Sequence, residues 1–303
     1  MADIKKEKEL KLQMKKILEI KNIKKSFIVK DRFGLKEIKT EALKDVSFHV
    51  YQGENFGIVG ESGSGKTTLA KIILYLVKPD KGKIFFNDEE VTGFSQKKML
   101  EYRKSTSIIF QNPYKSLNPR FTVEKTISES ISEKNKTIRN KIVEKLLEQV
   151  GLDTSYQHRF PHQLSGGERQ RIAIARAIAP QPSLIIADEP TANLDASIQG
   201  QIINLLMDIK TELGITYIFI SHDMKLINYF CDRVAILYKG EIVEIGTCEQ
   251  IVNTPSHPYT KILLNPDIKI DIKENINESE LIEIEPEHFV RKNSLPEIEN
   301  IIK

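Results

Sequence analysis

The sequence lacks tryptophan altogether and has two cysteines, Cys231 and Cys248, among its 303 residues. So few cysteines indicate a reduced, cytosolic setting, and neither of the two lies in a C-x-x-C spacing. It also lacks an apolar run of the roughly 18 to 20 residues that a membrane-spanning helix needs. The N-terminus is charged and has no apolar core of a signal peptide, so we expect no secretory signal.

A strong excess of either charge is also missing, because 45 Lys and Arg residues face 42 Asp and Glu residues, for a net charge of +3. This balance argues against a nucleic-acid-binding protein that relies on bulk charge. The basic run at residues 5–16 (KKEKELKLQMKK) is predicted to be a solvated arm or helix, with an anionic-lipid or nucleic-acid patch as the alternative. The length and the 40% hydrophobic content fit one large domain with a small appendage.

Residues 60–67 read GESGSGKT, which matches the phosphate-binding pattern G-x-x-x-x-G-K-[ST]. Glycines in this loop let backbone N–H groups approach phosphate oxygens. Lys66 supplies a positive charge to the β- and γ-phosphates of a nucleotide, and the Thr67 hydroxyl is placed to bind Mg²⁺. The predicted ATP contacts along this segment are Gly60, Glu61, Ser62, Gly63, Ser64, Gly65, Lys66, Thr67 and Thr68.

The flanking residues give this loop the expected context. Val46, Phe48 and Val50 alternate with polar residues, as in a half-buried strand, and residues 56–59 indicate a buried strand that runs into the loop. The apolar, helix-compatible run from residue 67 predicts a helix whose N-terminus attracts an anion. A strand, a glycine loop and a helix in this order turn a motif match into a predicted site.

Two adjacent carboxylates follow a second buried strand, predicted at residues 183–187 (SLIIA). Open α/β sheets bind ligands at the carboxyl ends of their strands, which is where Asp188 and Glu189 lie. We predict that Asp188 supports Mg²⁺ and that Glu189 is the general base that polarises the attacking water. The alternative is a surface acidic pair with no function.

Two further polar residues follow apolar runs in the same way. His222 comes shortly after residues 215–220 (ITYIFI) and is predicted to contact the γ-phosphate. Gln111 comes directly after residues 107–110 and is predicted to contact Mg²⁺ and the water. The predicted catalytic residues are therefore Glu189, His222, Lys66 and Gln111, and the predicted metal ligands are Thr67, Gln111 and Asp188.

Together these motifs, with LSGGERQ at residues 164–170 and ANLD at 192–195, occur in an order that resembles the ATP-binding subunits of ABC transporters. The resemblance covers residues 17 to 264. It implies that Ser165, Gly166, Gly167 and Asp195 act in trans, at the ATP site of a second cassette in a head-to-tail dimer. It also implies that Phe27 stacks on adenine, with a core position in the first hairpin as the alternative.

A closer resemblance lies in residues 112–123 (NPYKSLNPRFTV) and 253–264 (NTPSHPYTKILL), which are similar to the oligopeptide and dipeptide importer branch, especially its second ATPase subunit. ATPases of nickel and other small-solute importers remain the alternative. The branch often has a cysteine-rich C-terminal segment that is proposed to hold an iron–sulfur cluster. This chain has no cysteine there, so we expect no cluster.

The resemblance also implies partners and a location. The expected cofactors are ATP and Mg²⁺, and the expected partners are integral membrane permease subunits and a second ATPase subunit or a copy of this chain. An extracytoplasmic substrate-binding protein takes part indirectly, and no nucleic acid is expected. The chain is then peripheral, at the cytoplasmic face of the cell membrane. A soluble ABC protein of DNA repair or translation is the rival, and the single cassette without a long coiled-coil insertion argues against it.

The predicted fold class is α/β, with a parallel P-loop ATPase core, an antiparallel β subdomain and a helical subdomain. The expected organisation is an arm at 1–16, an ATPase domain at 17–265 with its helical subdomain at about 112–163, and an extension at 266–303. A helix is predicted over 137–150, with an apolar face that includes Ile138 and with Gly151 ending it. The extension is expected to form a small strand pair, to pack on the cassette or to be a mobile tail.

Overall fold

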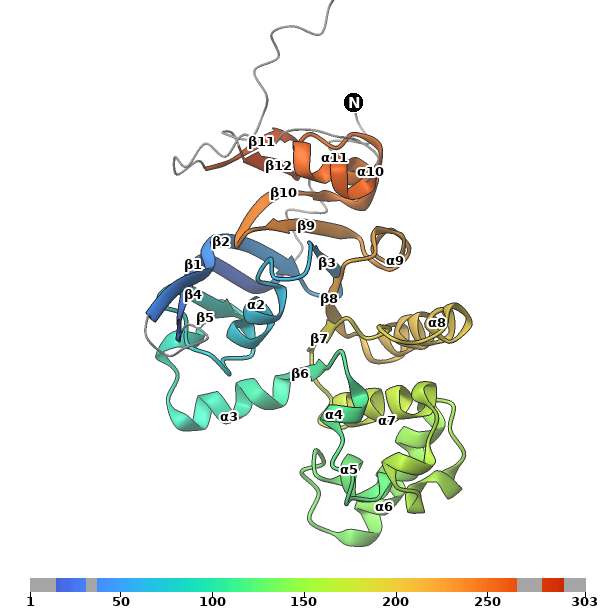
Figure 1. Ribbon diagram of the computed structural model, residues 1–303. Coiled ribbons are helices and arrows are strands. Elements are labelled where there is room, and N and C mark those ends of the chain that lie inside the picture. The colour runs from blue at the N-terminus through green and yellow to red at the C-terminus, as the bar shows by residue number, and fades with distance from the viewer. Residues whose placement is uncertain (1–14, 31–36, 266–279, 292–303) are drawn as a thin grey trace, which may run out of the picture. The chain divides into compact units, whose positions relative to one another are not determined.

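Two units of the chain, each with its own strands and helices, make up this computed structural model, which describes residues 15–30, 37–265 and 280–291. The first unit is drawn from Met1–Gly93 and Phe219–Lys303, and the second from Phe94–Ile218 (Figure 1). The predicted arm at 1–16, apart from residues 15 and 16, lies outside the described residues. Most of the predicted extension, at 266–279 and 292–303, does so as well.

The first unit contains a sheet whose strands run in the order β5-β4-β1-β2-β10-β9-β3. The bounds are β1 Lys16–Lys30, β2 Glu37–Tyr51, β3 Asn55–Val59, β4 Lys81–Phe86, β5 Glu89–Glu90, β9 Arg233–Tyr238 and β10 Glu241–Thr247. β1 pairs antiparallel with β2 and β4, which confirms the predicted antiparallel part. The alternation in β2 buries Val46, Phe48 and Val50, as expected for a strand with one core face.

The part of this sheet that carries the glycine loop is parallel. β3 pairs in parallel with β9, from Phe56 opposite Arg233 to Val59 opposite Ile236. Every residue of β3 is buried, which fits the run without polar side chains from Phe56 to Val59. After the loop, α2 (Lys66–Ile73) buries Leu69, Ala70, Ile72 and Ile73, and η1 is Val91–Gly93. The strand, loop and helix that the sequence predicted are therefore all present.

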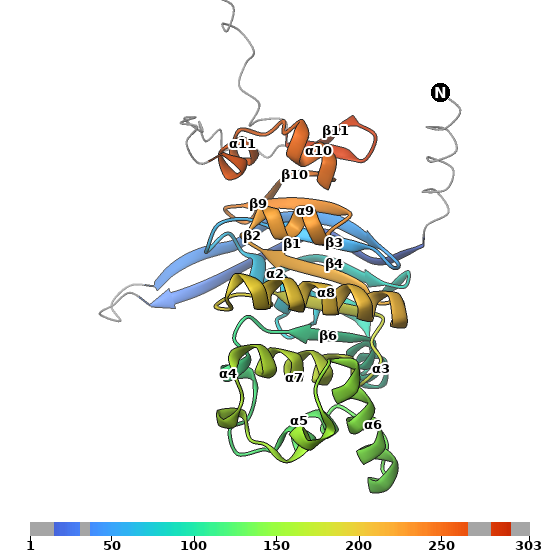
Figure 2. The same cartoon turned by 90° about the vertical axis from the view of Figure 1, so that its right-hand side faces the viewer.

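The C-terminal elements of the first unit pack around the β9–β10 hairpin. They are α9 Met224–Phe230, α10 Cys248–Asn253, α11 Pro258–Leu264, β11 Leu281–Glu285 and β12 His288–Arg291. β12 pairs antiparallel with β10 and with β11, so residues 280–291 add a strand pair to the sheet. The described residues of the extension therefore form a strand pair that also packs on the sheet of the cassette, and Figure 2 shows β11 at the same end of the chain's sheet as α10.

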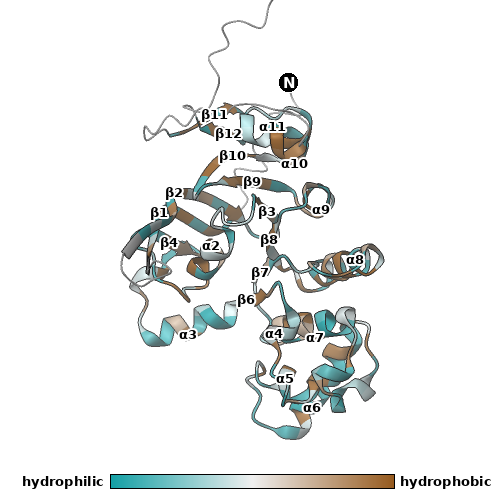
Figure 3. Cartoon of the chain, in the orientation of Figure 1, coloured by the Kyte–Doolittle hydropathy of each residue, from teal (hydrophilic) through white to brown (hydrophobic). Residues whose placement is uncertain are grey.

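The second unit combines a parallel strand pair with a group of helices. β6 (Thr106–Ile109) and β7 (Leu184–Asp188) pair in parallel, and the buried strand β8 (Thr216–Ser221) leads into the first unit. The helices are α3 Gln96–Ser105, α4 Pro113–Ser116, α5 Val123–Ser128, α6 Lys136–Gln149, η2 Thr154–His158, η3 Pro161–Gln163, α7 Gly166–Ile178 and α8 Ala196–Leu213. Figure 3 shows that α6 mixes polar residues in teal with apolar residues in brown.

The predicted helix over 137–150 is α6, and Gly151 follows it with a φ of +70° that suits a helix end. Val143, Leu146 and Leu147 form its buried face. Ile138 belongs to the same apolar face by its spacing, but it lies in the first turn of α6 and is 48% exposed. Among the described residues, no helix is long and apolar enough to cross a membrane.

Candidate functional site

The glycine loop at residues 60–67 is pressed closely against the strands behind it. A Cβ added to Gly60 would lie 2.1 Å from the carbonyl oxygen of Leu237 in β9. Gly65 has a φ of +110°, and a Cβ there would lie 2.6 Å from the carbonyl oxygen of Ala42 in β2. Because backbone oxygens cannot give way as flexible side chains do, the two glycines are required by close approach and by backbone conformation.

Lys66 folds back over this loop. Its Nζ donates to the carbonyl oxygens of Gly60, at 2.6 Å, and Glu61, at 2.8 Å, and the residue is only 6% exposed. The arrangement gathers a positive charge over a loop of main-chain groups, which favours an anion such as a phosphate group.

The start of α2 also suits an anion. Gly65 takes the N-cap position, and no side chain accepts a hydrogen bond there. The first turn of a helix carries N–H groups without intrahelical acceptors, and these attract negative charge. Beside them, the Oγ of Ser64 is buried and has no hydrogen-bond partner among the described residues. A phosphate group in the loop gives both features a partner, so the residues fit the predicted nucleotide.

The back of the loop is held by elements far along the chain. The N–H of Gly240, in the β9–β10 turn, donates to the carbonyl oxygen of Ser64 at 3.0 Å. The N–H of Glu61 donates to the Tyr259 Oη at 3.0 Å. Tyr259 lies in α11, within residues 253–264, whose sequence indicated only a resemblance to one branch of a family. The missed signal was a large aromatic with a hydroxyl in a segment that had no other explanation.

In the second unit, parallel pairing of β6 and β7 brings two predicted residues together. Gln111 follows β6, Glu189 follows β7, and Gln111 Nε2 donates to Glu189 Oε2 at 2.6 Å. Asp188 ends β7 and is 5% exposed. Glu189 has a φ of +47°, which is uncommon for a residue with a side chain and occurs most often where function requires it. The carboxylate that is predicted to act as base is thus oriented by Gln111.

The LSGGE segment forms a capped helix start. Ser165 is the N-cap of α7, and its Oγ accepts from the N–H of Glu168 at 3.3 Å. The N–H of Ser165 donates back to Glu168 Oε2 at 2.7 Å, which completes a capping box. A hydrogen bond from the Tyr156 hydroxyl, helped by the Ser165 N–H, lowers the pKa of Glu168 below its ordinary value. Ser165 and Gly166 remain exposed, as a contact to a second chain requires.

The ANLD segment lies beside this helix start. Asp195 is the N-cap of α8, and its Oδ1 accepts from the N–H of Ile198 at 3.0 Å. A Cβ added to Gly166 would lie 3.4 Å from Leu194, and one added to Gly167 would lie 2.9 Å from Ile198. The two motifs that were predicted to act in trans therefore adjoin each other within the second unit.

The two remaining predicted residues lie in the first unit. His222 follows β8 and is exposed, and Asp223 next to it caps α9 by accepting from the Lys225 N–H at 2.8 Å. Phe27 lies in β1 opposite Thr40 and is 38% exposed. The alternative of a core position for Phe27 is therefore wrong, and an exposed ring agrees with the predicted adenine contact.

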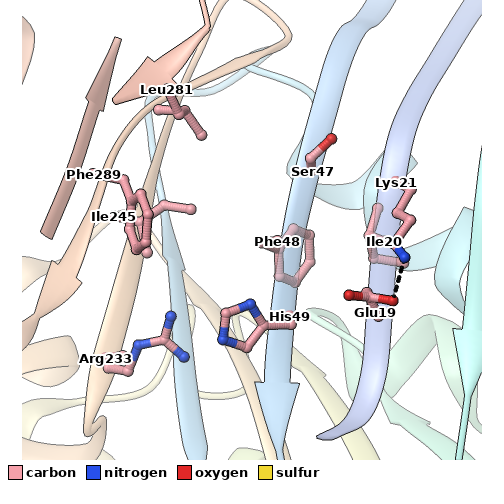
Figure 4. A pocket seen from close by; sticks show the side chains of 10 residues that line it. All are labelled: Glu19, Ile20, Lys21, Ser47, Phe48, His49, Arg233, Ile245, Leu281 and Phe289. Carbon is pink, nitrogen blue, oxygen red and sulfur yellow. Dashed lines mark ion pairs between the residues drawn. The ribbon is translucent and has the colours of Figure 1, made fainter. Parts of the chain in front are cut away.

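A separate open pocket of about 240 Å³ lies in the first unit (Figure 4). Phe48 and His49 of β2 line it together with Arg233, Leu281 and Phe289. None of the predicted ATP residues lines this pocket. Arg233 is already paired with Glu54 and Glu287, each at 3.2 Å, and burial, helped by Arg233, lowers the pKa of His49 to about 4, so its ring is neutral near pH 7.

A buried parallel strand, a glycine loop with an inward lysine and a helix without a side-chain cap define a P-loop nucleoside triphosphatase. Comparisons with known proteins narrow this class to one family. The family model of the ABC transporter matches residues 43–192. The oligopeptide transport ATP-binding protein OppF of Streptococcus mutans is 42% identical over 296 residues, which span 91% of this chain and 94% of that protein.

A second relative, the dipeptide transport ATP-binding protein DppF of Lactococcus lactis, is 41% identical over 91% of this chain and 94% of its own length. Among solved structures, a dimeric ATP-binding cassette, MJ0796, in a post-hydrolysis state with ADP and Pi matches with a TM-score of 0.68 and 29% identity, over 76% of this chain and 98% of its own. The cbiO1 protein of Clostridium perfringens matches with a TM-score of 0.68 and 27% identity, over 83% of this chain and 96% of its own. The chain belongs to the ABC transporter family, as one of its ATP-hydrolysing subunits.

Proposed function

We propose that this chain is the ATP-hydrolysing subunit of an importer that takes up oligopeptides across the cell membrane. The observation that carries the proposal is the glycine loop itself, where Lys66 covers Gly60 and Glu61 above a helix start without a side-chain cap. The names of the relatives, for oligopeptide and dipeptide transport, support the substrate class.

In this proposal the residues of the first unit bind the nucleotide. The loop from Gly60 to Thr68 holds the phosphates, Lys66 moves from the loop carbonyls to the β- and γ-phosphates, and Phe27 contacts adenine. His222 contacts the γ-phosphate. The exposure of Phe27 and His222 supports both roles, because each side chain is open to a ligand.

Residues of the second unit take part in ATP hydrolysis. Glu189 accepts a proton from the attacking water while Gln111 orients its carboxylate, which the 2.6 Å hydrogen bond between them supports. Thr67, Gln111 and Asp188 would hold Mg²⁺, which would supply positive charge to the phosphate oxygens. Such an ion takes few protein ligands and keeps several waters, so it does not require a cluster of carboxylates.

We also propose that two cassettes work head to tail, with Ser165, Gly166, Gly167 and Asp195 of one facing the nucleotide of the other. The second cassette is a copy of this chain or a different ATPase subunit. Both associate with permease subunits at the cytoplasmic face of the membrane, and an extracytoplasmic binding protein delivers the peptide. The dimeric neighbour MJ0796 supports the pairing of cassettes.

One experiment tests the ATPase and its pairing together. ATP turnover of the purified chain is measured against protein concentration, alone and mixed with Glu189→Gln protein, with the exposed Glu148→Gln on α6 as a matched control. We expect Glu189→Gln to lower turnover by roughly 10²–10⁴-fold while ATP still binds. Turnover that rises with the square of concentration and is inhibited by the mutant supports a homodimer.

Other results of that experiment are equally informative. Full turnover of Glu189→Gln contradicts its role as base, and a chain that binds no ATP contradicts the proposed function. Turnover that appears only with a second ATPase subunit or permease identifies a heterodimer.

The dipeptide relative supports dipeptides as a second substrate class. Uptake of a labelled dipeptide and a labelled pentapeptide by cells with and without this gene separates the two. Loss of pentapeptide uptake supports the main proposal, and loss of dipeptide uptake alone supports the second.

A further inference from the structure

The hydroxyl of Tyr259 is a long-range contact of the glycine loop. Its Oη accepts the N–H of Glu61 at 3.0 Å, although the residues are 198 positions apart in the chain. The ring is 2% exposed and packs on Tyr238, with ring centroids 4.2 Å apart. Burial raises the pKa of Tyr259 to about 12, so the hydroxyl stays protonated at any physiological pH. The packed ring therefore holds the Tyr259 hydroxyl in one place, where its oxygen accepts a hydrogen bond from the loop.

This contact meets the loop at Glu61, which is also one of the two residues that Lys66 contacts. The carbonyl oxygen of Glu61 accepts from Lys66 Nζ at 2.8 Å, while its N–H is taken by Tyr259. Both polar groups of Glu61 thus have partners, and they fix the orientation of the peptide groups on either side of it. Further along the loop, the N–H of Gly240 donates a hydrogen bond to the carbonyl oxygen of Ser64.

Helix α11, which carries Tyr259, is anchored by a buried carboxylate. His257 is the N-cap of α11, and its Nδ1 accepts from the N–H of Tyr259 at 3.0 Å. Glu244 of β10 is fully buried and accepts from the N–H groups of Ser256, at 2.8 Å, and His257, at 3.0 Å. The start of α11 is therefore tied to the sheet through main-chain groups.

The same carboxylate joins the C-terminal strand pair to this network. His288 of β12 places its Nε2 2.7 Å from Glu244 Oε1, and the residue is 1% exposed. Burial alone would raise the pKa of Glu244, but hydrogen bonds from His288, Ser256 and His257 lower it below its ordinary value. A charged carboxylate is costly to bury without partners, so the network holds these elements together as long as each partner is present.

We propose that Tyr259 is a positioning residue for the glycine loop, and that the Glu244–His288 pair anchors the helix that carries it. The proposal rests on the proposed function, because it assigns these residues to the ATP site of that ATPase. By removing the Glu61 N–H from the set of possible phosphate donors, Tyr259 leaves the later N–H groups of the loop to bind the anion. Preorganisation of this kind lowers the ordering cost of binding.

The test compares Tyr259→Phe with Tyr238→Phe, since each removes one hydroxyl from the same stacked pair. Amide hydrogen exchange over residues 58–64 is measured in the full-length chain without nucleotide, and the Kd of a non-hydrolysable ATP analogue is measured with Mg²⁺. We expect Tyr259→Phe to speed exchange of the Glu61 amide at least tenfold and to raise the Kd about two- to tenfold, the worth of one hydrogen bond. Tyr238→Phe should keep both within twofold of the wild type.

Two results overturn the proposal. One is a Tyr259→Phe protein with unchanged loop exchange and unchanged Kd. The other is a Tyr259→Phe protein that differs only in its melting temperature, which would make Tyr259 an ordinary core residue. If the wild type fails to bind the ATP analogue, the proposed function fails, and the exchange comparison still decides whether Tyr259 holds the loop.

A second pair of variants tests the anchor. His288→Ala removes the partner of Glu244, whereas His288→Gln keeps a side-chain N–H donor of similar reach. We expect faster exchange of the Glu61 amide in His288→Ala and recovery toward wild-type exchange in His288→Gln. Equal exchange in the wild type and His288→Ala would overturn the anchoring role of this pair.

Discussion

The helices α2 and α7 both begin at a glycine-rich motif, and they differ in how their first turns are satisfied. At α2 the N-cap is Gly65, and no side chain accepts a hydrogen bond from the first turn. At α7 the N-cap is Ser165, which exchanges two hydrogen bonds with Glu168. The first helix start is built for an external anion, whereas the second has a complete cap of its own.

The difference teaches why one chain carries two unlike half-sites. The cap of α7 uses the N–H of Glu168, not those of Gly166 and Gly167. A serine hydroxyl that accepts one hydrogen bond can still donate another, so Ser165 keeps a proton for a further acceptor. The α7 start is therefore stable in a single chain and still able to contact the nucleotide of a second cassette, as the proposed dimer requires.

The largest effect is expected for Lys66→Ala, because it removes the charge that bridges the loop carbonyls of Gly60 and Glu61. Loss of one partner of a buried charge contact costs about 2–5 kcal/mol of binding free energy, so ATP affinity should fall by at least tenfold. Isothermal titration calorimetry measures it, with the exposed Lys71→Ala of α2 as control. Near-wild-type affinity of Lys66→Ala would show that α2 does not depend on its lysine for anion binding.

The next effect is a difference in stability between alanine substitutions at Gly65, where α2 begins, and at Gly166, where α7 begins. Gly65→Ala places a side chain at a φ of +110° and 2.6 Å from a backbone oxygen, so we expect about 1–3 kcal/mol of lost stability together with weak ATP binding. In Gly166→Ala the new Cβ lies 3.4 Å from Leu194, an ordinary contact, so the fold should keep its stability.

The ATP turnover of Gly166→Ala should nevertheless fall in the proposed dimer, since Gly166 faces the second cassette there. Thermal unfolding and ATP turnover of both variants check the pair of expectations. Equal stability loss in Gly65→Ala and Gly166→Ala would remove the distinction between the two helix starts, and unchanged turnover of Gly166→Ala would contradict its role in trans.

A smaller effect distinguishes the cap from the catalytic contact at Ser165. Ser165→Ala removes the acceptor for the Glu168 N–H and should cost about 0.5–2 kcal/mol of stability. Ser165→Asp keeps an oxygen acceptor and therefore most of the stability, but its negative charge opposes a phosphate in trans. We expect turnover to fall in both variants and stability to fall mainly in Ser165→Ala. Full turnover of Ser165→Asp would show that Ser165 caps α7 and makes no contact with the phosphate in trans.

The last effect concerns stability alone, at a helix cap that titrates, unlike Ser165. Burial lowers the pKa of His257, the N-cap of α11, from 6.5 to about 4, so the neutral ring is the form that the fold accepts. In the unfolded chain this histidine becomes protonated below about pH 6.5, and its contribution to stability is lost as the pH falls from 6.5 toward 4. Between pH 7 and pH 5 the loss should be about 1–2 kcal/mol.

The matched variant is His257→Asn, which keeps a good N-cap but does not titrate. Urea unfolding at pH 7 and pH 5 should show a smaller loss in His257→Asn than in the wild type. His49, whose pKa is also lowered to about 4, contributes equally to both proteins and cancels in this comparison. An identical pH dependence of the two proteins would show that α11 starts independently of the charge on His257.

Much of the fold followed from local patterns. Alternation in β2, the continuous apolar runs of β3 and β7, and the periodicity of α6 each predicted the element that the structure contains. These predictions succeed because burial acts on each strand face or helix face separately. The same pattern did not indicate that Ile138 is exposed, since periodicity cannot tell where along a helix its packing partner ends.

The sequence by itself determined the chemistry of the candidate site, because a phosphate cradle needs glycines, a lysine and a hydroxyl at fixed local spacings. The tertiary structure alone decided which distant residues hold that cradle and orient the proposed base. Gln111 meets Glu189 across two parallel strands, Tyr259 meets Glu61 from the C-terminal helix, and His288 meets the buried Glu244. Such contacts have no local period, since they depend on which buried polar groups the finished fold brings within hydrogen-bond distance.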